Sequence, residues 1–308
     1  MPAAITHHIF GEDASRLLPD GLLSSEEELL AFLLGNQGPD PLWARFRTSP
    51  FQARACHALA SAIHESRVVE TLMSLRNATE HMRAEDERIA RAFSLGLSAH
   101  YLLDSIMHPL IYAQQIALCE ADPTLAGAQA EVHALLESDI DVWMLWQTRQ
   151  KTVLDSPTSS AFYTTERINH VAGALVAQAA WEVFGIEVGG AEYGGAVGDY
   201  RLMYRLLDPP ATRLPHLLAR IEKVARPHSR LAAQTHPATV DDECPAANLV
   251  HAPWRDPDNG ELSLASAADL FHDALIAWPM FSRRYAEGDH AWLTAAINHV
   301  NYNGRTYL

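Results

Sequence analysis

The sequence predicts an all-α protein built from many helices. Apolar residues recur at helical spacing through most of the 308 residues, and alternating strand patterns are nearly absent. The hydrophobic share of 48% is enough for a sizeable core in one large domain or two modest ones. We therefore expect a multi-helix protein whose polar site residues project between helices.

The first predicted helix begins at Ser24 and Ser25. These serines are followed by three glutamates and the apolar run LLAFLL, which is a capping-box start, and Gly35 is a suitable stop. The next stretch, NQGPDPLW, is predicted to be a loop because of its glycine and proline content. Residues 50–75 then predict a helix that carries His57 and His64.

The longest amphipathic pattern covers residues 84–118. Pro109 lies inside it and should kink that helix or end it just after His108. Further helices are predicted at residues 127–150, 164–184, 197–207, 213–225, 264–286 and 288–300. The segment 227–262 is rich in Pro, Asp, Asn and His and predicts a long irregular connection.

Charge and composition restrict the classes of partner. The net charge is −15, which makes the chain a poor binder of nucleic acid or anionic membranes, so we expect no stable nucleic-acid partner. No apolar run approaches the roughly 18 residues of a membrane span, and the first residues lack a secretory pattern. We expect a cytoplasmic protein whose three scattered cysteines are reduced structural thiols.

Three residue pairs at a spacing of four are the most informative feature. They are His100 with Asp104, Asp104 with His108, and His133 with Glu137. Residues four apart lie about 40° apart around an α-helix and therefore share one face. Imidazole and carboxylate groups at this spacing can bind a divalent metal such as zinc.

Ordinary structural roles are the alternative for such residues. A single helical histidine is more often a packed or surface residue than a ligand, and an i,i+4 pair can be a simple ion pair. Here, however, five ionisable residues fall on two successive predicted helices beside apolar neighbours. Placing them near a core is costly unless something pairs with them, and a metal would do so. His81, His170, His216, His228 and His236 are expected to be surface or core residues.

Four segments occur in a characteristic order: HIFG at His8–Gly11, LGNQGPD at Leu34–Asp40, LGLSAHYLLDSIMHP at Leu95–Pro109 and HALLESDID at His133–Asp141. With these segments the chain resembles the zinc-dependent phospholipase C family, whose all-α fold is shared with P1-type nucleases. The segments span nearly the first half of the chain. The resemblance implies a metal-site region at residues 1–150 and a helical region at residues 151–308, packed in the same domain.

The resemblance also implies three sets of zinc ligands. The first set is Asp40, His57, His100 and Asp104; the second is His108, His133 and Glu137; the third is His8 with Asp104. Family members complete the third site with an N-terminal tryptophan, and this chain has none near its start. His7 could contribute there, or His8 could orient a neighbour. His64, seven residues after His57, is the alternative to His57.

A cluster of two or three zinc ions suits phosphodiester hydrolysis, because the metals bind phosphate oxygens and acidify water. The resemblance implies that Asp40 acts as general base as well as ligand; otherwise it is a turn residue in GPDP. We expect a zinc-dependent phospholipase C-like hydrolase acting on a phospholipid head group or a small phosphodiester. The alternatives are a single-strand nuclease-like enzyme and a catalytically inactive metal-binding structural protein. A nuclease would need stacking platforms; Trp43, Trp143 and Trp146 are present, but the acidic charge and their helical spacing favour core packing for them.

Overall fold

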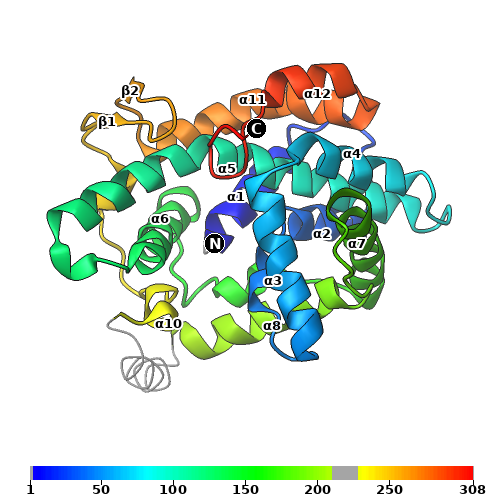
Figure 1. Cartoon of the computed structure of the whole chain (residues 1–308), viewed down its shortest axis with the longest axis horizontal. Helices are drawn as coiled ribbons and strands as arrows, with labels where there is room; N and C mark the ends of the chain where they lie inside the picture. The colour runs from blue at the N-terminus through cyan, green and yellow to red at the C-terminus, as the bar shows by residue number, and fades with distance from the viewer. Residues whose placement is uncertain (1–2, 210–227, 308) are drawn as a thin grey trace. The chain divides into compact units, whose positions relative to one another are not determined.

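The computed structural model describes residues 3–209 and 228–307, and it confirms the all-α prediction. Within these residues the only strands are β1 (Trp254–Arg255) and β2 (Leu262–Ser263), which form one antiparallel pair (Figure 1). None of the described helices is both long enough and apolar enough to span a bilayer. The helix predicted at residues 213–225 lies outside the described residues.

The α-helices are α1 (Ala4–Ser15), α2 (Glu26–Gly35), α3 (Pro50–Glu65), α4 (Val68–Thr79), α5 (Glu87–Ala121), α6 (Gln129–Arg149), α7 (Glu166–Ala179), α8 (Glu192–Leu207), α10 (Arg230–Ala233), α11 (Ala267–Glu287) and α12 (His290–Ile297). Short 3₁₀ turns are η1 (Asp40–Ala44), η2 (Pro123–Leu125), η3 (Thr158–Phe162) and η5 (Pro245–Ala247), and η4 (Ala180–Phe184) is a π-helix.

The chain divides into two compact units, each built from three segments. Unit 1 comprises Met1–Thr6, Met107–Ala161 and Arg201–His272. Unit 2 comprises His7–Ile106, Phe162–Tyr200 and Asp273–Leu308. Both units therefore draw on both halves of the sequence.

Local sequence signals explain the ends of α2. Ser25 Oγ accepts a hydrogen bond from the backbone N of Glu28 at 3.2 Å, and Glu28 Oε2 accepts one from the backbone N of Ser24 at 2.8 Å. The first bond satisfies a donor that has no partner within the first turn, which is the Ser25 half of the predicted capping box, whereas the Glu28 carboxylate reaches one residue beyond the N-cap, to Ser24. The helix ends at Gly35, as predicted.

The described structure differs from the predictions in several places. The helix expected over residues 50–75 is two helices, because Arg67 adopts a left-handed conformation (φ 54°) between α3 and α4. Helix α5 continues through Pro109 to Ala121, so an end at His108 is wrong. Proline removes one backbone donor, but packing of the surrounding turns can sustain a helix across it. Helix α1 was not predicted.

In unit 2, a pair of glycines allows α2 and α5 to approach closely. A Cβ atom on Gly35 would lie 2.2 Å from the carbonyl oxygen of Phe93, and one on Gly96 would lie 2.1 Å from that of Phe32. Only glycine permits backbones to meet at this distance. The core around them contains large buried side chains, among them Tyr193 and Trp278, and α4 packs against both α7 and α12 (Figure 1).

A buried ion network fixes the chain directly after η1. Asp199 is fully buried and accepts hydrogen bonds from Arg45 Nη1 at 2.7 Å and from the backbone N of Phe46 and of Arg47 at 3.0 Å each. Arg45 Nε also donates to Glu192 Oε2 at 2.7 Å. Since η1 begins at Asp40, the network anchors the segment that presents this carboxylate.

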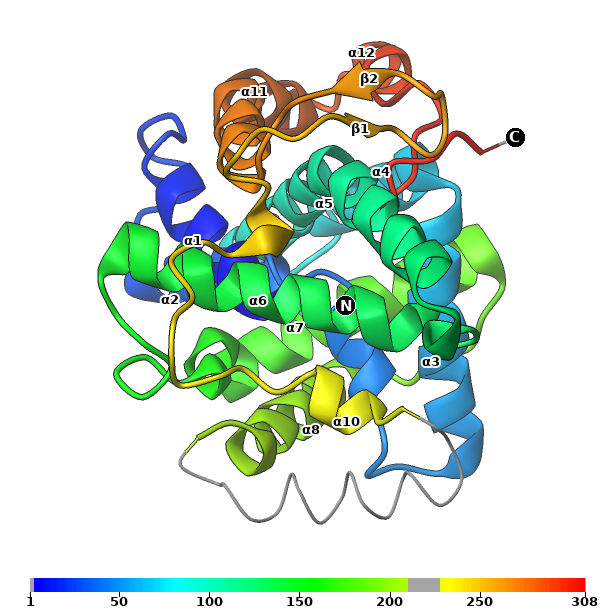
Figure 2. The same ribbon diagram turned by 90° about the vertical axis from the view of Figure 1, so that its left-hand side faces the viewer.

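In unit 1, α6 packs against α10 (Figure 2) and carries Asp141 into a buried triad. His236 Nε2 lies 3.1 Å from Asp141 Oδ2 and His236 Nδ1 lies 3.2 Å from Asp208 Oδ1. Burial disfavours the charged imidazole, but hydrogen bonds to both carboxylates outweigh it and raise the pKa of His236 to about 9. Asp141 also accepts the backbone N–H groups of Ile5 and Thr6 at 2.9 and 2.7 Å, which caps the first turn of α1.

Candidate metal centre

Unit 2 gathers five potential ligands, which we call the five-residue cluster: His7, Asp40, His64, His100 and Asp104. Two groups of three have ligand atoms within 4.8 Å of one another, His7–His100–Asp104 and Asp40–His64–His100. The side chain of His64 is 11% exposed and the other four are less exposed. The donors are imidazole nitrogens and carboxylate oxygens, as a zinc ion prefers.

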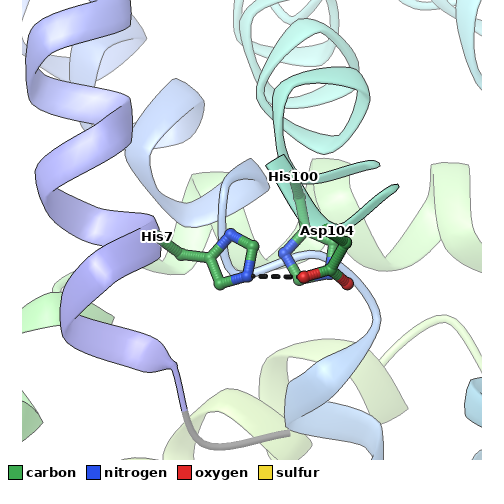
Figure 3. Close-up of side chains that lie close together, drawn as sticks. All are labelled: His7, His100 and Asp104. Carbon is green, nitrogen blue, oxygen red and sulfur yellow. Dashed lines mark hydrogen bonds and ion pairs between the residues drawn. The ribbon is translucent and has the colours of Figure 1, made fainter. Parts of the chain in front are cut away.

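His100 and Asp104 share one face of α5, as their spacing predicts, with 3.2 Å between His100 Nε2 and Asp104 Oδ2. Helix α1 contributes His7, whose Nε2 lies 3.0 Å from Asp104 Oδ1 (Figure 3). The His7 and His100 rings are stacked, with centroids 4.0 Å apart and an interplanar angle of 24°. Asp104 therefore contacts the Nε2 atoms of two stacked imidazoles that come from different helices.

The other side of the five-residue cluster is formed by Asp40 and His64. His64 Nε2 lies 3.1 Å from Asp40 Oδ1 and 3.9 Å from Asp104 Oδ2. Burial would raise the pKa of Asp40, but the positive charge of the amino terminus, and then the hydrogen bond with His64 and the proximity of His100, lower it to about 2. Asp40 is thus an ionised carboxylate at neutral pH.

The orientation of the imidazoles indicates what the cluster can bind. His64 Nδ1 lies 2.7 Å from the Ala60 carbonyl oxygen and His100 Nδ1 lies 2.9 Å from that of Asn36, so both nitrogens carry hydrogen. In the neutral rings, Nε2 then presents a lone pair toward a carboxylate. Two lone pairs facing each other need a proton or a cation between them, and outward-fixed Nδ1–H groups are typical of histidines that bind metal.

Protons alone do not satisfy the cluster. Burial and the neighbouring His100 lower the pKa of His7, which is therefore neutral at pH 7. Burial opposes charging of His100 as well, but the Asp104 carboxylate outweighs it and raises the pKa of His100. Within the part of the chain that the structure describes, buried His7 Nδ1, Asp40 Oδ1 and His100 Nε2 have no aligned hydrogen-bond partner. A bound divalent cation would give such atoms a partner.

The turn between α2 and η1 is shaped around His100. Gly38 has φ +55°, and a Cβ atom there would lie 2.3 Å from His100 Cδ2. Tyr193 donates a hydrogen bond from its hydroxyl to the Gly38 carbonyl oxygen at 2.8 Å, which holds the turn in place. The segment LGNQGPD therefore supplies a close helix contact, the acceptor for His100 Nδ1, the turn glycine and the carboxylate of Asp40.

Unit 1 contains a second group of three potential ligands: His108, His133 and Glu137. Both imidazoles direct Nε2 at Glu137 Oε1, each at 3.3 Å. Gln115 Oε1 lies 2.9 Å from His133 Nδ1 and fixes that ring from behind. Burial would raise the pKa of Glu137, but His133 and His108 hold it well below its ordinary value, whereas burial lowers the pKa of His133.

The structure brings together six of the eight predicted ligands, in two groups within separate units. The exceptions are His57 and His8, which join neither group among the described residues. His57 stacks against Trp43, with ring centroids 6.5 Å apart, and its place with Asp40 is taken by His64. His57 and His64 share a helix face, but two turns separate them by about 10 Å along the axis, so only one can reach Asp40.

His8 is replaced by its neighbour for a similar reason. Adjacent residues point about 100° apart around a helix, so His7 and His8 cannot face the same cluster. His7 is 2% exposed and bonds to Asp104, whereas His8 Nε2 lies 3.8 Å from Glu12 Oε1 with its side chain 27% exposed. Sequence alone did not fix the rotation of α1, because that segment was not predicted to be helical.

No protein-family model matches the chain, and no curated protein and no solved structure is significantly similar to it. The resemblance to zinc-dependent phospholipases C therefore stays a prediction that rests on the sequence segments. The geometry of the two ligand groups is the independent observation on which a functional proposal can be built.

Proposed function

We propose that the protein is a zinc-dependent phosphodiester hydrolase of phospholipase C type, acting on a phospholipid head group or a small phosphodiester. One observation carries the proposal: His64, His100 and His133 each have Nδ1 beside a carbonyl-type oxygen and direct Nε2 at a carboxylate. That arrangement prepares three imidazoles to bind metal in the required tautomer. The resemblance of the sequence segments supplies the choice of zinc and of a phosphodiester.

Each of the two units contains its own set of residues that would hold a metal ion. Asp40, His64 and His100, with His7 and Asp104 beside them, would hold it in unit 2, and the other three ligands would do so in unit 1. Zinc supplies Lewis-acid chemistry, which polarises a phosphoryl oxygen and acidifies water. Because the pKa of Asp40 is about 2, its carboxylate is a weak base. We therefore assign Asp40 Oδ1 the role of orienting the attacking water by accepting a hydrogen bond from it.

Elemental analysis and a hydrolysis assay test the proposal together. Purified protein should contain at least one zinc ion per chain, and zinc-restored protein should cleave bis(4-nitrophenyl) phosphate or phosphatidylcholine. His64→Ala should abolish turnover, while His57→Ala, on the same helix, should retain it. Zinc-restored protein that turns over neither substrate would refute the hydrolase. Selective release of nucleotides from single-stranded DNA would instead support the nuclease-like alternative.

Burial favours a second candidate, a metal-stabilised structural protein without catalysis. The His100 side chain is 0% exposed and that of Glu137 is 2% exposed, which leaves little room for a substrate at those atoms. In this case zinc would be present and His133→Ala would lower the melting temperature strongly, but no phosphodiester would be hydrolysed. The two candidates therefore predict the same metal content and opposite results in the hydrolysis assay.

A further inference from the structure

Residues 299–307 form a short hairpin in unit 2, which we call the 299–307 hairpin. Val300 and Thr306 are bridge partners across it. At its tip, Asn301 Oδ1 accepts hydrogen bonds from the backbone N of Asn303 at 2.9 Å and of Arg305 at 3.0 Å. These bonds give the hairpin a defined shape although it belongs to neither a helix nor a sheet.

The hairpin caps the end of α3. The last four carbonyl groups of a helix have no N–H partner within it. Asn301 Nδ2 donates to the Glu65 carbonyl oxygen at 3.0 Å, and Asn303 Nδ2 donates to that of His64 at 3.4 Å. His64 lies in the last turn of α3, where a helix would otherwise fray. The hairpin therefore holds the turn that carries a candidate ligand.

Tyr302 packs against the ligands themselves. Its ring centroid lies 5.2 Å from that of His64 and 5.7 Å from that of His100, and the side chain is fully buried. Tyr101 supports it from α5, with ring centroids 5.1 Å apart and a hydrogen bond from the Tyr101 hydroxyl to the Val300 carbonyl oxygen at 3.0 Å. Burial and then the Asp104 carboxylate raise the pKa of Tyr302 well above its ordinary value, so the phenol is neutral.

We propose that the 299–307 hairpin is a positioning element of the metal centre, which holds His64 beside Asp40 and His100 so that these three side chains bind a divalent cation. The inference rests on one part of the proposed function, the binding of metal by this centre, and does not require hydrolysis. Partners that orient metal ligands without touching the ion typically change metal affinity by about 10- to 100-fold when they are removed. An effect of that size is expected for the Asp40–His64–His100 group, because the hairpin contacts described above involve His64 and His100.

Cobalt(II) is a suitable probe, because its ligand-field absorption reports the geometry of the ligands. Titrations are made in a His133→Ala background, which removes one ligand of the group in unit 1. Asn303→Ala should weaken binding about tenfold and Tyr302→Leu by up to about 100-fold, with an altered absorption band. Tyr302→Phe keeps the ring and should restore affinity. Asn77→Ala, an exposed asparagine of α4, is the matched control and should change nothing.

A second background separates positioning from general destabilisation. In His64→Ala protein the side chain that the hairpin holds is gone, so Asn303→Ala should cause no further loss of affinity, and Tyr302→Leu should cost less than in the parent because only its contact with His100 remains. Equal weakening in both backgrounds would overturn the inference, and so would hairpin variants that bind cobalt as tightly as their parent. In either case the proposed function survives, since metal still binds. A wild-type protein that binds neither cobalt nor zinc would overturn both. Asn303→Ala removes the 3.4 Å hydrogen bond to the His64 carbonyl oxygen, and circular dichroism checks that the fold of this variant persists.

Discussion

The buried His236 triad should make the protein less stable as the pH rises from neutral to alkaline. His236 is 0% exposed, and the two acceptor carboxylates of Asp141 and Asp208 require hydrogen on both of its ring nitrogens. Its pKa rises from 6.5 to about 9 on folding. The folded state holds this proton more tightly than the unfolded chain does. In the pH range where the folded protein therefore binds more protons, the free energy of unfolding falls as the pH rises.

The magnitude follows from the size of the shift. A rise of the pKa from 6.5 to about 9, at about 1.4 kcal/mol for a tenfold change in proton affinity, gives roughly 3 to 3.5 kcal/mol of stabilisation. This contribution is fully present below pH 6.5, declines between pH 6.5 and 9 and is absent above pH 9. The free energy of unfolding should therefore fall by about 3 kcal/mol across that window from this residue alone.

Urea denaturation from pH 6 to pH 10 measures the effect, with EDTA present so that metal binding does not contribute. The wild type should lose about 3 kcal/mol more across the window than His236→Gln, which cannot titrate. His228→Gln is the control, since His228 lies in the same unit and its Nε2 lies 2.9 Å from the carbonyl oxygen of Thr124 at the surface. Parallel pH profiles for wild type and His236→Gln would refute the reasoning.

Three further predictions concern unit 2 and the metal. Gly38→Ala should destabilise the protein in urea by about 2 kcal/mol more than Gly21→Ala, because both have positive φ but only Gly38 meets His100; equal losses would contradict this. Asp199→Asn should lower the free energy of unfolding by about 3 kcal/mol, because it disrupts a buried ion network. Asp20→Asn, at an exposed site, should lower it by less than about 0.5 kcal/mol. Zinc at 100 times its dissociation constant should stabilise the metal-free protein by about 2.7 kcal/mol in calorimetry, and an unchanged melting temperature would exclude a bound ion.

Helical periodicity in the sequence was sufficient to predict most of the fold. Local signals such as the capping box at Ser25 and the i,i+4 pair on α5 concern neighbours within a single helix, so no knowledge of the tertiary structure is needed. The break at Arg67 was missed because apolar residues continue at helical spacing on both sides of it. Its left-handed conformation must be sustained by tertiary contacts, such as the hydrogen bond from Arg67 Nη1 to the Val183 carbonyl oxygen at 2.6 Å.

In the candidate site, too, contacts within one helix could be predicted from the sequence, whereas contacts between elements could not. Within one helix, the spacing of His100 and Asp104, or of His133 and Glu137, fixes which side chains meet. The choice between His57 and His64 depends on the position of α3 along its axis relative to η1. That position is set by the tertiary structure and not by the local sequence. Tyr302 was unpredictable for a stronger reason, since more than 200 residues separate it from each of the histidines that it contacts and no periodicity extends across such a distance.

The two buried histidine clusters differ in a way that separates an ion triad from a set of ligands. His236 faces a carboxylate with each nitrogen, so one added proton satisfies every contact of its ring. His100 has a carbonyl at Nδ1 and a carboxylate at Nε2, and the latter contact lacks hydrogen-bond alignment. Protonation of His100 would leave Asp40 Oδ1 and His7 Nδ1 still without aligned partners, whereas a shared cation could approach several such atoms at once. The opposite response to acid follows: protons strengthen the His236 triad, but they compete with metal for the five-residue cluster.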